Sequence, residues 1–117
     1  MVIHAVVDGD TADVSLTGDL VANTATQLKE QLALLAQQGV VRIVLNLRNV
    51  NFMDSSGLNA FIEAHKQFLA RGGRIILLAP TGAVSRVFKI TGADRKFRIA
   101  ATREQCLALL QEGKSPG

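Results

Sequence analysis

The residues at the start of the chain have the pattern of apolar and polar positions expected of a β-hairpin. Residues 2–7 are mostly apolar, residues 8–10 (Asp-Gly-Asp) are turn formers, and residues 12–16 alternate between apolar and polar side chains. Two such runs joined by a short glycine-containing turn are typical of antiparallel strands. We therefore expect a hairpin over residues 2–16.

A helix and then a strand-helix-strand unit are predicted next. Residues 24–27 (Thr-Ala-Thr-Gln) match a capping box, and apolar residues then recur at helical spacing until Gly39. Residues 40–47 and 74–78 have the β-branched and leucine content of buried strands. Between them, residues 56–70 have the apolar spacing of a helix. This order predicts a right-handed crossover between parallel strands.

The last third of the chain predicts three short elements. Val84, Val87 and Phe88 fit a short helix that ends near Gly92, and Phe97 and Ile99 suggest a brief strand. A second capping box at residues 102–105 (Thr-Arg-Glu-Gln) predicts the start of a final helix. The residues expected to face inward from this helix are Cys106, Leu109 and Leu110. The predicted fold class is α/β, with a mixed sheet.

Composition agrees with a single globular domain. The chain has 117 residues, of which 48% are hydrophobic and 20% are charged, and a chain of this size can bury a core of its own. We expect residues 1–112 to form one domain and residues 113–117 to form a disordered tail.

Several classes of function are disfavoured. The longest apolar runs, such as residues 75–79, span five residues, whereas a membrane-spanning helix needs about 20. The N-terminus lacks the basic start and apolar stretch of a secretion signal. His4, His65 and Cys106 do not have metal-ligand spacing, and a single cysteine is typical of the reducing cytoplasm. We therefore expect a cytoplasmic protein with no membrane insertion, metal ion or other cofactor.

The net charge of +3 is divided unevenly along the chain. Residues 1–54 hold three basic and six acidic side chains, and residues 55–117 hold ten basic and four acidic ones. The basic excess includes Arg86, Lys89, Arg95, Lys96 and Arg98. Such a cluster fits a solvated face, a contact with a partner, or nucleic acid. Because the chain has no Trp or Tyr to stack on bases and no recognition motif, we expect no nucleic-acid partner.

The most informative segment is residues 51–58 (Asn-Phe-Met-Asp-Ser-Ser-Gly-Leu), between a predicted strand and its helix. A helix N-terminus beside Ser55 and Ser56 is a favourable setting for an added phosphate. The same serines, and Asp54, are also natural helix caps. Gly57 would allow close packing at the start of the helix. Spacing alone therefore leaves a capping role and a functional role both open.

Serine hydrolysis is an alternative for this segment. The nucleophile elbow has the pattern Gly-x-Ser-x-Gly, but here Met53 stands where the first glycine is needed. His65 lies ten residues along the predicted helix from Ser55, about 15 Å away at 1.5 Å per residue. His4, on the first strand, is expected at the surface. We therefore expect no catalytic residue and no enzyme.

Residues 44–47 (Val-Leu-Asn-Leu), followed by residues 51–58, resemble the signature of STAS domains, and in particular of bacterial anti-sigma factor antagonists. The likeness covers roughly residues 3 to 111. It includes residues 16–20 (Leu-Thr-Gly-Asp-Leu) and the glycine pair at 72–73. The resemblance implies the STAS fold, a mixed sheet of four or five strands with helices packed mainly on one side.

The resemblance also implies a regulatory switch. In such antagonists the serine after the aspartate, Ser55 here, is phosphorylated by a partner anti-sigma factor that is itself a serine kinase. The unphosphorylated form binds that anti-sigma factor and releases the sigma factor, and a metal-dependent serine phosphatase reverses the modification. Ser56 is an alternative acceptor. The expected partner-binding residues are Asp54, Ser55, Ser56, Gly57, Leu58, Asp19 and Asn23.

One position departs from the family pattern. Members commonly carry an aspartate after the Gly-x-Leu or Gly-x-Ile that precedes the first helix, and this chain has Val21 there. Either Asp19 or Asn23 partly replaces that carboxylate, or Val21 is simply a core residue. An alternative function within the family is a structural or regulatory subunit of a lipid-trafficking ABC transporter or of a stress-sensing complex.

Overall fold

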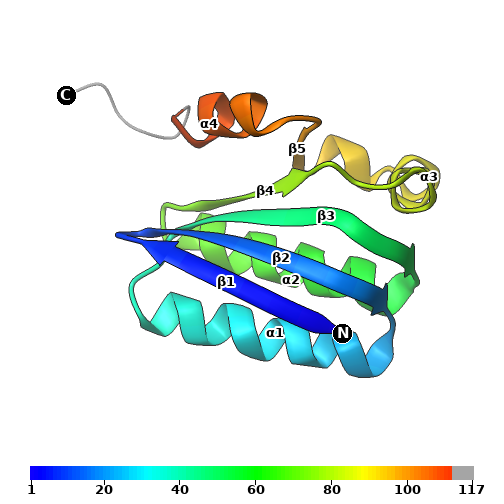
Figure 1. Ribbon diagram of the computed structural model, residues 1–117, viewed down its shortest axis with the longest axis horizontal. Coiled ribbons are helices and arrows are strands. Elements are labelled where there is room, and N and C mark those ends of the chain that lie inside the picture. The colour runs from blue at the N-terminus through cyan, green and yellow to red at the C-terminus, as the bar shows by residue number, and fades with distance from the viewer. Residues whose placement is uncertain (112–117) are drawn as a thin grey trace.

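The predicted hairpin and crossover are both present in the computed structural model, which describes residues 1–111 (Figure 1). The predicted tail at residues 113–117 lies outside the described residues. The elements in chain order are β1 (Val2–Asp8), β2 (Thr11–Leu20), α1 (Ala22–Gln37), β3 (Arg42–Met53), α2 (Ser55–Ala70), β4 (Arg74–Leu78), α3 (Gly82–Thr91), the 3₁₀ turn η1 (Ala93–Arg95), β5 (Arg98–Ala100) and α4 (Arg103–Gln111).

The strands form one five-stranded mixed sheet in the order β1-β2-β3-β4-β5. β1 pairs antiparallel with β2, which confirms the hairpin, and the other three pairings are parallel. The predicted crossover from β3 through α2 to β4 therefore connects parallel neighbours. Because β2 and β3 are parallel, their carboxyl ends lie at the same edge of the sheet.

Helices α1 and α2 cover one face of the sheet, and α4 lies on the opposite face (Figure 1). Phe61 of α2 and Phe88 of α3 belong to the larger core cluster, with ring centroids 6.3 Å apart. A buried side chain of this size contributes about 1.5–3 kcal/mol to the free energy of unfolding. Cys106 of α4 is buried against β3, β4 and β5, as predicted. Helices on mainly one side of a mixed sheet confirm the predicted fold class.

Strand β3 is longer than predicted. The sequence placed its end at Leu47, but β3 continues to Met53. Arg48, Asn49 and Asn51 resemble loop residues in the sequence, yet β3 stays paired with β2 through two irregularities in register. The extension matters because it carries the strand directly to Asp54.

Helix α1 starts earlier than its capping box predicted. The helix begins at Ala22, so Thr24 is the third residue of the helix and not its cap. The Thr24 hydroxyl accepts a hydrogen bond from the Val21 N–H at 2.9 Å and donates to the Asp19 carbonyl at 2.6 Å. A threonine at the third helical position that hydrogen-bonds to residues before the helix gives the same sequence pattern as a threonine at the cap position.

At the other end of the chain, the cap predicted for α4 is present, because the Gln105 N–H donates to the Thr102 hydroxyl at 3.3 Å. Within residues 1–111, none of the helices has the length and apolar content needed to cross a membrane.

Candidate functional site

The site predicted around Ser55 lies where β2 and β3 end side by side. Leu20 and Met53, the last residues of the two strands, are paired in register. The Asp54 N–H donates to the Leu20 carbonyl at 3.1 Å, which joins the β3–α2 junction to the β2–α1 junction. The parallel pairing therefore brings Asp19 and Ser55, far apart in sequence, to one edge of the sheet.

Asp54 caps helix α2. Its Oδ1 accepts hydrogen bonds from the Ser56 N–H at 2.9 Å and the Gly57 N–H at 3.3 Å. The capping role that spacing left open is therefore present in the structure. The cap also changes one expectation. Two N–H groups at the helix end already bind a carboxylate, so a phosphate on Ser55 would receive less stabilisation from the helix end than expected.

The predicted partner-binding residues divide by exposure. Ser55, Asp19 and Asn23 are exposed, whereas Asp54 and Ser56 are half-buried. Gly57 and Leu58 are buried, so they support the junction from below and do not form its surface. Of the two candidate serines, Ser55 is therefore the more accessible to another protein.

Gly57 occupies a place where no side chain fits. A Cβ built on Gly57 would lie 2.8 Å from both the Leu20 Cβ and the Met53 Cγ, closer than real Cβ atoms approach. The absence of a side chain allows the first turn of α2 to pack directly against the ends of β2 and β3. This contact positions Ser55.

The β2–α1 junction provides no second carboxylate at the family position. Val21 is the N-cap of α1 and makes no side-chain capping bond. It is half-buried, so the expectation that Val21 is a core residue was wrong. Asn23 uses its Oδ1 to accept a hydrogen bond from the Thr24 N–H at 3.1 Å. The nearby exposed carboxylate is that of Asp19.

Sequence reasoning missed Phe52 at this edge. Phe52 pairs in register with Asp19 and is 51% exposed, unusual for a large aromatic residue. Strand alternation would have placed the Phe52 side chain outward and the Met53 side chain inward. This pattern can be recognised only if β3 is extended beyond Leu47. The edge thus combines an exposed apolar ring, an exposed hydroxyl and carboxylates.

The arrangement gives no support to serine hydrolysis. His65 lies in the middle of α2, where its ring packs edge-on against Phe97 at a centroid distance of 5.4 Å. His4 is exposed and pairs with Ser15 in the middle of the hairpin. Neither histidine is at the edge that carries Ser55, so the hydroxyl lacks a base of the kind that hydrolases use.

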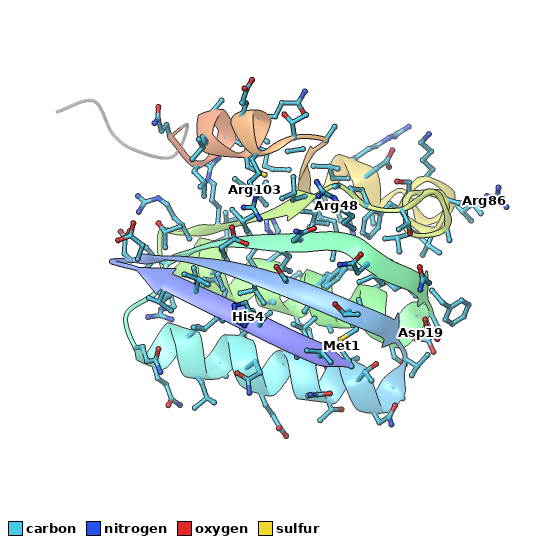
Figure 2. All side chains as sticks on the ribbon, viewed as in Figure 1. Met1, His4, Asp19, Arg48, Arg86 and Arg103 are labelled. Atoms are coloured by element: carbon cyan, nitrogen blue, oxygen red, sulfur yellow. The ribbon has the colours of Figure 1, made fainter. Side chains whose placement is uncertain are left out.

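The basic cluster predicted from the sequence is divided in space. Arg86 and Lys89 lie on α3, and Figure 2 shows Arg86 and Asp19 at the same end of the molecule. Arg95, Lys96 and Arg98 instead border a cavity beside His65. Among residues 1–111, no group of three or more His, Cys, Asp or Glu residues has the geometry to hold a metal ion.

Comparison with known proteins agrees with this fold. The STAS domain family matches residues 3–106. The anti-sigma-B factor antagonist of Listeria monocytogenes is 32% identical over 85 residues, which are 73% of this chain and 75% of that protein.

Two solved structures of one protein are similar as well. The anti-sigma factor antagonist SpoIIAA in its unphosphorylated form has a TM-score of 0.81 and 26% identity, over 95% of this chain and 97% of that chain. The Bacillus cell fate determinant SpoIIAA in its phosphorylated form has a TM-score of 0.72 and 27% identity, over 92% and 97% of the two chains. From its sequence match and its five-stranded mixed sheet, the chain belongs to the STAS domain family.

Proposed function

We propose that this protein is an anti-sigma factor antagonist controlled by phosphorylation of Ser55. The observation that carries the proposal is the exposed Ser55 at the first position of α2, directly after the capping Asp54. The similarity to proteins named anti-sigma factor antagonists supports it, and it favours a partner switch over a subunit of a transporter or stress-sensing complex.

The unphosphorylated protein binds an anti-sigma factor in the cytoplasm, and the sigma factor is thereby released. The binding surface is centred on Ser55 and includes the exposed ring of Phe52 and the carboxylate of Asp19. Aromatic side chains are common anchors at the centre of protein interfaces. Asp54 contributes a carboxylate whose position is fixed by its two hydrogen bonds to α2.

The anti-sigma factor is also the kinase. The Ser55 oxygen attacks the γ-phosphorus of ATP, the bond to the ADP oxygen breaks, and the hydroxyl proton leaves to the kinase. A metal-dependent serine phosphatase returns Ser55 to the hydroxyl form by hydrolysis and releases inorganic phosphate. Ser56 is a poorer acceptor because it is half-buried.

Phosphorylation prevents binding by adding charge at the centre of the surface. The phosphate adds about −1.5 to −2 charges beside Asp54. A partner surface fitted to a neutral hydroxyl then meets repulsion and a desolvation cost of a few kcal/mol. Such a loss weakens binding by about two or more orders of magnitude.

Phosphorylation by the cognate anti-sigma factor tests the proposal. The protein is incubated with that factor and Mg-ATP, and the modified residue is mapped by mass spectrometry. We expect one phosphate on Ser55, no modification of Ser55→Ala, and unchanged modification of Ser56→Ala. A label on any other residue, or none on the wild type in the presence of an active kinase, would reject control through Ser55.

A further inference from the structure

Strand β1 forms one edge of the sheet, and β5 forms the other (Figure 1). β5 has three residues, whereas β1 has seven. An edge strand presents unpaired N–H and C=O groups, and proteins protect such edges with short strands, lysine, proline or bulges. β1 contains no lysine or proline, and it pairs with β2 in continuous register without a bulge. Within residues 1–111, the outer side of β1 is therefore open to another strand.

The register of the hairpin determines which backbone groups of β1 point outward. A two-residue turn that begins at Gly9, whose φ is +62°, separates the paired residues Asp8 and Thr11. In such a tight hairpin the flanking residues are hydrogen-bonded to each other, and hydrogen-bonded and non-hydrogen-bonded pairs then alternate along the strands. The residues whose N–H and C=O groups point away from β2 are therefore Ile3, Ala5 and Val7.

These outward groups match a second copy of the same strand. When two β1 strands pair antiparallel with Ala5 opposite Ala5, Ile3 of each copy lies opposite Val7 of the other. Each of these pairs exchanges both of its N–H···O=C bonds, so every outward group of the three residues gains a partner. The pairing has two-fold symmetry, as most dimers of identical chains do.

The side chains of β1 also fit this pairing. Val2, Val6 and Val7 are 66%, 57% and 46% exposed, although valine is among the residues most often buried. His4 lies diagonal to Asp8 of the second copy on the same face, and an imidazole N–H can donate to that carboxylate. Asp8 lies directly opposite Val2 of the second copy, so like charges do not face each other.

Helix α1 lies beside its own copy in this arrangement. The Gln27 side chain donates to the Met1 carbonyl at 3.3 Å, so this side of α1 faces the beginning of β1. Gln31 and Leu34 follow at helical spacing on the same side, and Leu34 is 48% exposed. These three side chains carry no charge, so two α1 helices can approach along them without repulsion.

We propose that the protein forms a dimer in which two β1 strands pair antiparallel about Ala5 and join the two sheets into one. Because the symmetry axis reverses the direction of the strands, the two edges that carry Ser55 lie at opposite ends of the joined sheet. The pairing uses none of the residues proposed to bind the anti-sigma factor. The dimer is therefore independent of the proposed partner switch.

The residue on the symmetry axis allows a test by charge. Ala5 is exposed and lies opposite its own copy, so Ala5→Lys or Ala5→Glu alone places like charges opposite each other. A mixture of the two variants places opposite charges there. Ala108→Lys and Ala108→Glu are the matched controls, because Ala108 is also exposed and belongs to α4, on the other face of the sheet. Sedimentation equilibrium measures self-association, and circular dichroism checks that each variant folds.

We expect the wild type to form dimers as its concentration rises to about 1 mM. Each Ala5 variant alone should associate at least about tenfold more weakly, and their equimolar mixture should return to within about threefold of the wild type. The Ala108 variants should stay within about twofold. A single-chain mass for the wild type at that concentration would overturn the assignment to a second copy and leave the edge to a strand of another protein. Equal association of the two Ala5 variants and their mixture would overturn the pairing about Ala5.

Amide hydrogen exchange locates the interface without any substitution. The outward N–H groups of Ile3, Ala5 and Val7 should exchange at least about tenfold more slowly as the dimer forms. The N–H groups of His4 and Val6 point toward β2 in the single chain and should change little. Protection that appears on association at the edge with Ser55, and not in β1, would overturn the proposal.

Discussion

At the scale of single residues, Asp54 caps α2 and lies next to the proposed phosphorylation site at Ser55. Its carboxylate caps α2 through the Ser56 and Gly57 N–H groups, and it adjoins the exposed Ser55. Because those N–H groups are occupied, a phosphate on Ser55 meets the Asp54 charge with less compensation from the helix end. The cap therefore strengthens the repulsion on which the proposed switch depends.

Replacement of Asp54 separates its two roles. Asp54→Ala should lower the free energy of unfolding by about 1 kcal/mol, because the cap is lost. Asp54→Asn keeps an acceptor oxygen and should remain close to the wild type in urea unfolding. If the capping hydrogen bonds of Asp54, and not its negative charge, support binding, Asp54→Asn should also bind the anti-sigma factor as tightly as the wild type. A stability of Asp54→Ala equal to that of the wild type would show that the cap is unimportant.

The half-buried ring of His65 predicts a pH dependence of stability. Burial, and then Arg74, lower the pKa of His65 below 6.5 in the folded protein, so the unfolded chain takes up the proton at higher pH. The free energy of unfolding should therefore fall as pH decreases through 6.5 and toward the folded pKa. His65→Gln should lose this dependence between about pH 7.5 and 5.5, while His4→Gln, at an exposed position, keeps it. Urea unfolding across that range measures both, and an unchanged slope in His65→Gln would contradict the account.

At the scale of elements, the predictions succeeded where an apolar pattern was continuous and failed where long-range pairing decided the boundary. The bounds of β4, 74–78, were predicted correctly from its five apolar-rich residues. The end of β3 was not, because Arg48, Asn49 and Asn51 are held in the strand by pairing with β2, which no local pattern reports. The same error hid Phe52 from the predicted site.

The site itself was predicted in part. Its serines were singled out by their place at the strand-to-helix junction, and the role of Ser55 was implied by the resemblance. The choice of Asp54 as the cap remained open because aspartate and serine are both common caps. The meeting of Asp19 with the β3–α2 junction depends on the parallel pairing of β2 and β3. The cavity beside His65 could not be predicted, because its lining residues come from α2, β4, η1 and β5 and share no local pattern.

Close packing of α2 against two strand ends gives a direct test at this scale. Gly57→Ala should lower the free energy of unfolding by about 1–3 kcal/mol, because its Cβ would overlap Leu20 and Met53. Gly82→Ala is the matched control. It lies at the first position of α3, where a Cβ meets nothing within 4 Å, and it should change stability by less than about 0.5 kcal/mol. Equal denaturation midpoints for the two variants would show that the junction relaxes around the added methyl group.

At the scale of the whole molecule, charge differs between the edge that carries Ser55 and the cavity beside His65. Asp19 and Asp54 lie at the edge with Ser55, while Arg95, Lys96 and Arg98 line the cavity beside His65. One phosphate lowers the net charge from +3 to about +1, and all of the change falls at the acidic edge. Ser55 is exposed and belongs to neither of the two core clusters, so added charge there does not disturb buried packing.

Phosphorylation should therefore act locally. In amide NMR spectra of the two forms, shifts should be confined to the β2–α1 and β3–α2 junctions, and signals from β4, β5 and α4 should coincide. Widespread shifts would mean that the phosphate changes the fold, and exclusion by charge would then be the wrong mechanism.

The affinity of the anti-sigma factor for Ser55 variants tests the central claim most directly. Isothermal titration should give dissociation constants within twofold for the wild type and Ser55→Ala, and at least tenfold weaker binding for Ser55→Asp. Gln67→Glu, which adds a negative charge at an exposed position far along α2, should bind like the wild type. Equal affinities for the wild type, Ser55→Ala and Ser55→Asp would contradict a switch at Ser55.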